Sequence, residues 1–115
     1  MITDKVIPIA DLGGASELQC PRCKSQCLHH CGVKVFDRGE DHETVMYIEV
    51  AGAAVTTRIM PSAGSGNPSS RRDGLAIQFW CEGCSEKEAT PIELTIAQHK
   101  GSTEIAWRYQ PLPKN

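Results

Sequence analysis

Cysteines are the side chains of this 115-residue chain best suited to chemistry, and four of its six cysteines form two CxxC pairs. Cys20 and Cys23 make the first pair, and Cys81 and Cys84 make the second. Two residues between thiolates let one tight turn direct both sulfur atoms at a single ion, and two such turns complete a tetrahedron around zinc. The long interval between the pairs is no obstacle, because the entropic cost of loop closure grows slowly with length. The spacing therefore predicts a four-thiolate zinc site.

A site of this kind is structural, because four thiolates fill the coordination sphere and leave no open position for water or substrate. Pro21 presets the first turn, and Gly83 relieves crowding in the second. Bound zinc then contributes directly to the free energy of folding. The competing interpretation is a thiol oxidoreductase that uses one CxxC pair, but no βαβ pattern of the thioredoxin type accompanies either pair.

The remaining two cysteines leave a second ligand set open. Cys27 and Cys31 follow the first CxxC pair closely, so the four cysteines of residues 20–31 could form a local site, and thiolates also bind iron–sulfur clusters. Against this, Cys31 alternates with Val33 and Val35 along a strand pattern, where cysteine behaves as a small apolar core residue. The local site would also leave the second CxxC pair without a role.

Two adjacent histidines, His29 and His30, offer a different chemistry beside these cysteines. They suggest a metal-dependent nuclease as the alternative enzyme. Neighbouring side chains on a strand point to opposite faces, so both histidines cannot readily serve one site. The sequence also lacks a recognisable asparagine and second histidine on a following helix to complete such a centre. We therefore assign no catalytic residue, and the sequence favours a protein that is not an enzyme.

The segments that must position these residues read as β-strands. Apolar residues alternate with polar ones over residues 28–36, 44–59, 75–81 and 92–109, and a short edge strand is expected near the start of the chain. A hairpin turn is expected at Lys100 and Gly101, and no segment has the pattern of a three-turn amphipathic helix. The predicted fold is all-β or mainly β: a small antiparallel sheet or sandwich in which two CxxC turns hold the metal.

Residues 61–74 form a long loop rich in glycine, serine and proline, which we expect to be flexible. Arg71 and Arg72 lie in this loop. Guanidinium groups donate bidentate hydrogen bonds to phosphate or carboxylate, so these two residues are candidates for binding a partner. The alternative interpretation is a mobile, solvated connection between strands, in which Asp73 could neutralise Arg72.

Composition limits the chain to one domain, residues 1–115. Only 5% of residues are aromatic, which predicts a thin core that needs additional stabilisation, and the zinc supplies it. Twelve basic and fourteen acidic residues give a formal charge of −2, which argues against a protein that coats nucleic acid. We find neither an apolar run of membrane-spanning length nor a basic leader, and we expect a cytoplasmic protein with reduced thiols.

The two CxxC turns resemble those of the zinc-ribbon class, in which turns from two β-hairpins clamp one zinc ion. Glycine often follows the second cysteine of each turn in that class, whereas Lys24 and Ser85 stand there in this chain. Residues 36–41 (FDRGED) and 67–74 (NPSSRRDG) are similar to segments of a family of small uncharacterised bacterial and prophage proteins. The ribbon resemblance implies a module that docks a protein or a nucleic acid.

These observations predict a zinc-binding protein with a structural four-cysteine site that serves as a docking module. Its net acidity favours a protein over a nucleic acid as the partner, and the loop containing Arg71 and Arg72 is the candidate contact. An exposed sheet edge makes a homodimer a further expectation.

Overall fold

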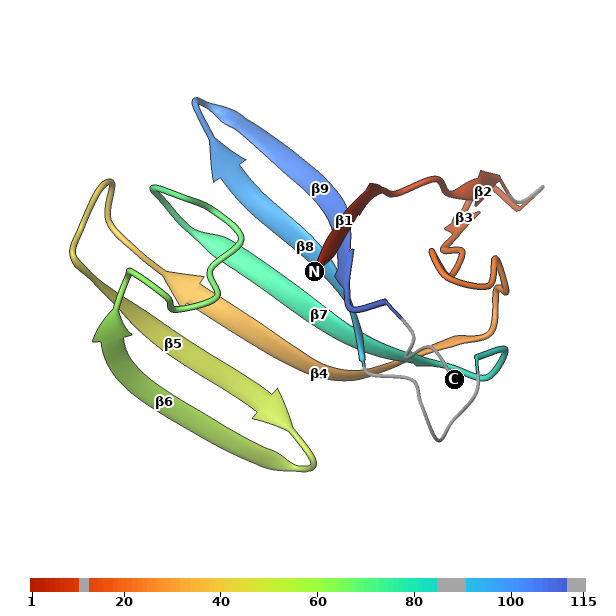
Figure 1. Cartoon of the computed structure of the whole chain (residues 1–115), viewed down its shortest axis with the longest axis horizontal. Coiled ribbons are helices and arrows are strands. Elements are labelled where there is room, and N and C mark those ends of the chain that lie inside the picture. Colours follow the sequence, from red (N-terminus) through yellow and green to blue (C-terminus); the bar gives the residue numbers. More distant parts are fainter. Residues whose placement is uncertain (11–12, 85–90, 112–115) are drawn as a thin grey trace.

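The computed structural model describes residues 1–10, 13–84 and 91–111 (Figure 1). These ranges contain β-strands and no helix, and so no helix long and apolar enough to cross a membrane. A seven-stranded sheet has the order β1-β9-β8-β7-β4-β5-β6 with antiparallel neighbours, and β2 pairs with β3 separately. The strands are β1 (Ile2–Lys5), β2 (Ile9–Ala10), β3 (Ser16–Glu17), β4 (Leu28–Asp37), β5 (Thr44–Ala51), β6 (Ala54–Pro61), β7 (Gly74–Cys81), β8 (Ile92–His99) and β9 (Ser102–Tyr109). The predicted all-β fold is confirmed.

Two-residue turns close both long hairpins. Gly52 and Ala53 connect β5 to β6 with φ of 57° and 61°, and Lys100 and Gly101 connect β8 to β9 with φ of 47° and 83°. Positive φ at both central residues matches the right-handed twist of the flanking strands, which favours this type of turn in tight hairpins. The turn expected at Lys100 and Gly101 is therefore confirmed, and the region 44–59 is a hairpin.

A bulge in β4 changes the faces that were expected there. The register of β4 against β7 shifts between His30 and Gly32, so His30 lies opposite Phe79 and Val33 lies opposite Ile77. His30 consequently shares a face with Val33, whereas strict alternation had placed Cys31 there. Cys31 is exposed at the bulge and its thiol donates to the carbonyl of Gln78 at 3.5 Å. The expectation that Cys31 packs in the core is wrong, because a bulge inserts one residue that the alternation does not count.

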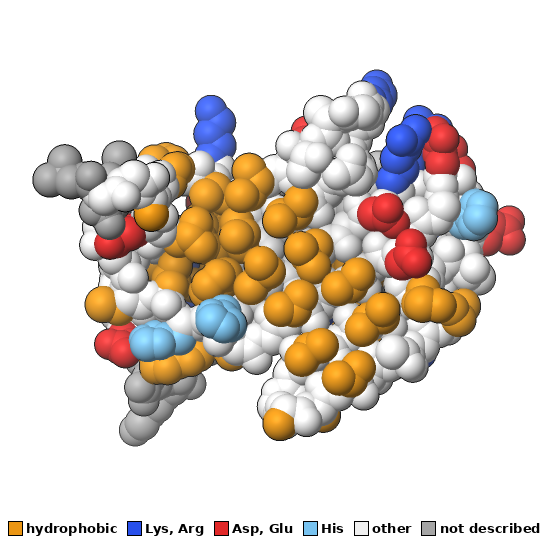
Figure 2. Space-filling model, turned by 180° about the vertical axis from the view of Figure 1, so that it is seen from behind, with side chains coloured by type: hydrophobic (Ala, Val, Ile, Leu, Met, Phe, Trp, Pro, Cys, Tyr) orange, Lys and Arg blue, Asp and Glu red, His pale blue; other side chains and the backbone are white. Residues whose placement is uncertain are grey.

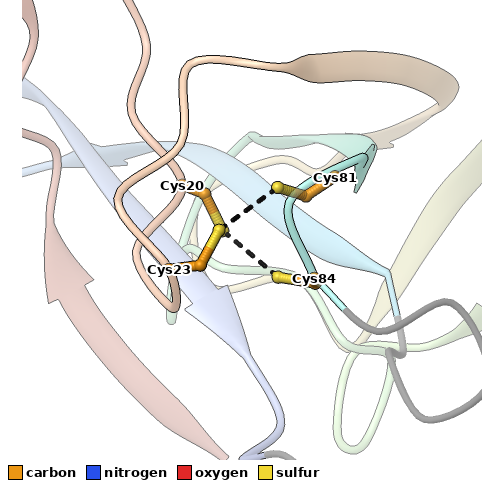
Figure 3. A group of neighbouring side chains, drawn as sticks. All are labelled: Cys20, Cys23, Cys81 and Cys84. Atoms are coloured by element: carbon orange, nitrogen blue, oxygen red, sulfur yellow. Dashed lines mark hydrogen bonds between the residues drawn. The ribbon is translucent and has the colours of Figure 1, made fainter.

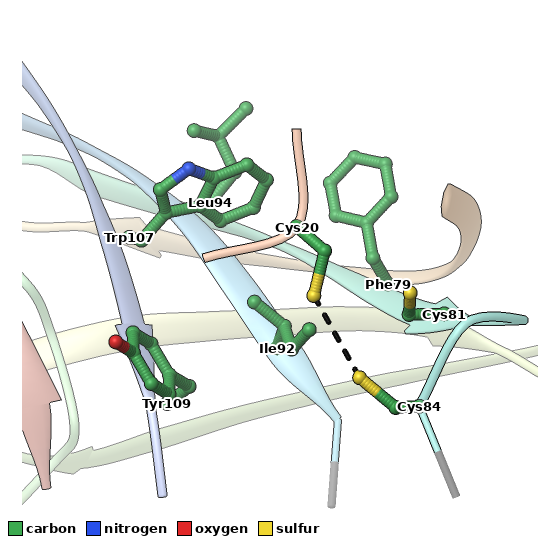
Figure 4. Packing of buried hydrophobic residues seen from close by; sticks show 8 residues of the cluster. All are labelled: Cys20, Phe79, Cys81, Cys84, Ile92, Leu94, Trp107 and Tyr109. Atoms are coloured by element: carbon green, nitrogen blue, oxygen red, sulfur yellow. Dashed lines mark hydrogen bonds between the residues drawn. The ribbon is translucent and has the colours of Figure 1, made fainter. Parts of the chain in front are cut away.

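Two separate cores lie on opposite faces of the sheet. The first, here called the metal-side core, lies at one end of β7, β8 and β9 (Figure 4). The second, the loop-side core, is smaller and lies between β4, β5 and β6. The strand registers place the two groups on opposite faces, since side chains of alternate residues point to opposite sides. The metal-side core contains Cys20, Phe79, Cys81, Cys84, Ile92, Leu94, Trp107 and Tyr109, and the loop-side core contains Phe36, Val45 and Tyr47 with Met60 against them.

The loop of residues 62–73 lies over the face that carries the loop-side core. Asn67 accepts a hydrogen bond from the backbone N–H of Ser69 and donates one to the carbonyl of Arg72, which closes the loop on itself. Ser69 is buried and its hydroxyl donates to the carbonyl of Gln98 in β8. Gly74 begins β7 with no room for a side chain, because a Cβ there would collide with Asn67 and Pro68. Whether the loop is flexible stays a prediction.

A buried carboxylate connects three strands on the same face. Glu93 in β8 accepts from Lys34 in β4 at 2.9 Å and from Arg108 in β9 at 2.9 Å. Arg108 also donates to the carbonyl of Gly66, which ties the loop to the sheet. Burial alone would raise the pKa of Glu93, but the hydrogen bond from Lys34 and the charge of Arg108 outweigh it, so the pKa lies below its ordinary value of 4.5.

The face that carries the metal-side core is uncovered beyond that core. Figure 2 shows hydrophobic side chains gathered over the middle of this face and continuing toward the hairpin of β5 and β6. Exposed residues include Met46, Val50, Val55, Ile59 and Ile105. Their registers place them on one face with the half-buried Val33, Val35, Ile48, Leu75, Ile77 and Ile96. Apolar patches of this extent are uncommon on monomeric proteins and usually mark an interaction site.

Candidate metal centre

The structure brings together the two CxxC pairs that the sequence singles out (Figure 3). The Sγ atoms of Cys20, Cys23, Cys81 and Cys84 all lie within 4.8 Å of one another. Cys20 Sγ is 3.8 Å from Cys84 Sγ, and Cys23 Sγ is 3.5 Å from Cys81 Sγ. Ligands at about 2.3 Å from a tetrahedral zinc ion stand roughly 3.8 Å apart, so these separations fit one ion at the centre.

The first CxxC turn is a tight backbone loop between β3 and β4. The N–H of Cys20 donates to the carbonyl of Ser25 at 2.8 Å, and the N–H of Lys24 donates to the carbonyl of Cys20 at 3.0 Å. Lys24 adopts a left-handed conformation with φ of 68°. Glycine enters this region of φ without steric cost, whereas Lys24 adopts it with a side chain.

The second turn extends the end of β7 and fits closely against the first. The N–H of Cys84 donates to the carbonyl of Cys81 at 3.3 Å, and Glu82 is tied by its N–H to the carbonyl of Cys27. A Cβ on Gly83 would lie 2.8 Å from the Cβ of Ser25 and 3.0 Å from Cys23 Sγ. Real Cβ atoms essentially never show the shorter separation, so glycine is needed for the two turns to approach. The expectation that Gly83 relieves crowding is confirmed.

The cysteine cluster is built into the metal-side core, as Figure 4 shows. Cys20 is fully buried, and Trp107 and Ile92 beside it are each only 1% exposed. Phe79 meets Trp107 edge to face, with ring centroids 5.9 Å apart. Arg22 caps the assembly by donating twice to the carbonyl of Gln110. The metal ligands and the aromatic core therefore form one unit.

The surroundings of the cluster oppose ionisation of the two cysteines of the second turn and favour ionisation of Cys23. Burial raises the pKa of the Cys84 and Cys81 thiols, and contacts with the neighbouring sulfur atoms raise it further. Burial opposes ionisation of Cys23 too, but hydrogen bonds from the backbone at Ser25 and from the other cysteines lower its pKa overall. A bound divalent cation would reverse this balance, because coordinated thiols lose their protons.

Cys27, Cys31, His29 and His30 do not join the cluster. Among the described residues, the four cysteines of the CxxC pairs are the only group of three or more potential ligands close enough to hold a metal. His29 stacks on Trp80 with ring centroids 4.4 Å apart, and its Nε2 lies 2.6 Å from Glu82 Oε1. His30 projects from the face of the sheet opposite to that of His29. The arrangement favours the long-range ligand set over the local one and gives the nuclease interpretation no second ligand cluster.

Arg71 and Arg72 are engaged with acidic residues of the β4–β5 turn. Arg71 makes a bidentate contact with Asp41 at 2.8 and 2.6 Å, and Arg72 reaches Glu40 at 3.1 Å. The hydrogen bond from Arg71 holds the pKa of Asp41 below its ordinary value. All four side chains remain about half exposed. A partner that bound these arginines would compete with the two acids, and their role in docking stays a prediction.

Sequence reasoning missed two contributors to the site. Glu82 lies between the two cysteines of the second pair and contacts His29, a residue outside that motif. Arg22 lies within the first CxxC pair, but its contact with Gln110 joins residues 88 positions apart. The spacing of residues within a motif does not predict contacts between residues so far apart in the sequence.

Comparison with known proteins returned no relatives: no family model matches, and neither a curated protein nor a solved structure shows significant similarity. The four-cysteine cluster and the all-β sheet therefore stand on the geometry of this chain alone.

Proposed function

We propose that this protein binds one structural zinc ion through Cys20, Cys23, Cys81 and Cys84. The observation that carries the proposal is the close approach of the four Sγ atoms, all within 4.8 Å. A cage of this size suits a single ion, whereas an iron–sulfur cluster must hold several irons and sulfides between its thiolates. Tetrahedral coordination by four sulfur atoms is typical of zinc. The two facing CxxC turns correspond to a zinc-ribbon site.

The contacts between sulfur atoms support a clamp over a redox dithiol. Cys20 Sγ lies 3.8 Å from Cys84 Sγ and Cys23 Sγ lies 3.5 Å from Cys81 Sγ, so both contacts join the first turn to the second. A thiol oxidoreductase would instead use the two cysteines of one CxxC pair, with one of them accessible to substrate. Cys81 and Cys84 are both buried, which argues against the second pair. Cys23 of the first pair is exposed, but its Sγ faces Cys81 Sγ of the second turn at 3.5 Å. The four ligands also close the coordination sphere, which leaves no position for substrate on the metal.

The zinc stabilises a module that binds a protein partner. Several exposed side chains on the face of the metal-side core are apolar, among them Val50 and Val55, which suits a protein surface and not a phosphate backbone. Arg71 is already paired with an acid, and the formal charge of the chain is −2. Binding to nucleic acid would rely on phosphate contacts and weaken steeply with salt. Salt-sensitive binding to DNA or RNA oligonucleotides would contradict this part of the proposal.

Elemental analysis of purified protein tests the metal assignment. We expect one zinc per chain, lost in Cys81→Ser because three thiolates and a hydroxyl hold the ion far less tightly. Cys31→Ser is the matched control: it removes an exposed thiol outside the cluster and should retain the zinc. Zinc retained in Cys81→Ser, or lost in Cys31→Ser, would contradict the ligand set.

A further inference from the structure

The two edges of the large sheet differ in how well they are protected. β1 is a four-residue edge that carries the charged residues Asp4 and Lys5. β6 is an eight-residue edge that carries no lysine, has its proline only at the last position and keeps an unbroken register with β5. Natural proteins protect exposed edges with short strands, charges, prolines or bulges, because an open edge is a template for pairing. Along its central residues, β6 has none of these protective features except the charge of Arg58.

The outward groups of β6 are set by the hairpin that begins it. Ala51 and Ala54 flank a two-residue turn and therefore exchange both ladder hydrogen bonds. Alternation along an antiparallel pair then directs the N–H and C=O groups of Val55, Thr57 and Ile59 toward the open edge. Within the described parts of the chain no other strand pairs there, since β6 ends the strand order.

These groups are self-complementary across a twofold axis. If Thr57 lies opposite Thr57 of a second copy, then Val55 lies opposite Ile59 of that copy and Ile59 opposite its Val55. The three pairs would form about six backbone hydrogen bonds, because all three residues direct their groups outward. Val55 is 67% exposed and Ile59 is 61% exposed in the single chain, and each would gain an apolar cross-strand neighbour.

Charge complementarity on the other face favours the same register. Arg58 would lie opposite Thr56 of the second copy, and Thr56 lies opposite Glu49 within its own chain. Arg58 and the second copy's Glu49 are then about 10 Å apart between backbones, across the short threonine, which two long side chains span readily. The guanidinium of Arg58 rests over the ring of Tyr47 at 5.1 Å, so it lies against the sheet face and does not block the edge.

We propose that a second copy of this chain is a protein partner, bound by antiparallel pairing of the two β6 strands with Thr57 at the twofold axis. This deepens the proposed protein-binding role and rests on it. The metal-side core lies at β7, β8 and β9, away from β6, so assembly and metal binding separate in experiment. Two seven-stranded sheets would join into one continuous sheet.

Sedimentation equilibrium of the full-length, zinc-loaded protein tests the proposal at concentrations up to about 100 μM. We expect twice the chain mass of 12.5 kDa. Thr57→Lys places like charges opposite each other at the axis and should raise the dimer dissociation constant by at least about tenfold. Thr44→Lys is the matched control, because it changes an exposed threonine of β5, which is not an edge strand, and should leave the dimer intact.

Charge reversal tests the register itself. Arg58→Glu and Glu49→Arg should each weaken the dimer, and the double variant should restore most of the affinity because the opposite charges face each other again. Thermal melts of each variant separate assembly from folding. A monomer at every concentration, a dimer unaffected by Thr57→Lys, or a double variant no better than the singles would overturn the proposal. Zinc content near one per chain in a monomer would leave the metal assignment standing.

Discussion

The metal-side core and the loop-side core differ in how they compensate for the small number of large apolar side chains in this chain. The metal-side core gathers two aromatic rings of β9, the Phe79 ring and three buried thiols from both ends of the chain. Among the described residues, the loop-side core has three buried members, and a polar loop covers it through hydrogen bonds such as that of Ser69 to Gln98. A chain with 5% aromatic residues thus builds one core around a cysteine cluster and covers the other with a polar loop.

Removal of the metal by a chelator should give the largest difference in behaviour between the two cores. Structural zinc contributes about 10–16 kcal/mol of apparent binding free energy in small zinc peptides, so its removal should unfold the metal-side core. Amide hydrogen exchange measured with and without a chelator should accelerate most at Cys20, Ile92 and Trp107. Exchange at Val45 and Tyr47 should change less, since their strand pairs do not involve the ligands. Equal acceleration in both regions would show that they unfold as one unit.

A matched pair of phenylalanine substitutions should distinguish the two cores, with a smaller loss of stability than chelation causes. Phe36→Ala and Phe79→Ala each remove a buried ring and should lower the free energy of unfolding by about 3–5 kcal/mol. Only Phe79 packs with the cysteine cluster, so only its substitution should also weaken zinc retention. Chemical denaturation combined with a competing zinc chelator measures both quantities. Comparable zinc loss in Phe36→Ala would contradict the separation of the two cores.

Glu93→Gln should give the smallest of these effects, about 1–3 kcal/mol at neutral pH, because it removes a charge buried between two cations. The pKa of Glu93 is depressed in the folded protein, so its stabilisation is complete above about pH 5 and is lost as pH falls through the folded value below 4.5. Denaturation curves of both proteins should therefore converge on acidification. Both proteins carry the same cysteines, so the difference between the curves isolates Glu93. A gap that stays constant with pH would contradict this assignment.

Local patterns predicted the strands well, and they singled out the four cysteines that the structure brings together. The CxxC turns and the hairpin at Lys100 and Gly101 depend on neighbouring residues, and alternation reveals a strand wherever one face is apolar. The bulge at Cys31 escaped prediction because it arises from the register against β7, which the sequence of β4 does not contain. Glu93 escaped for a similar reason. A charged residue in an alternating strand predicts a solvated face, and its burial depends on Lys34 and Arg108 arriving from other strands.

The first and last strands of the sheet pair with each other, Ile2 opposite Tyr109, and this arrangement governs how the chain can reach its native state. The first cysteine pair leaves the ribosome long before the second, with Cys20 and Cys84 separated by 64 positions. The strands that complete the metal-side core are made last. Contacts of such long range slow folding, because their loop-closure entropy is lost before they contribute stability. Until the segment from Cys81 to Tyr109 is made, a nascent chain therefore holds Cys20 and Cys23 without the second cysteine pair, and β1 without the strand beside it.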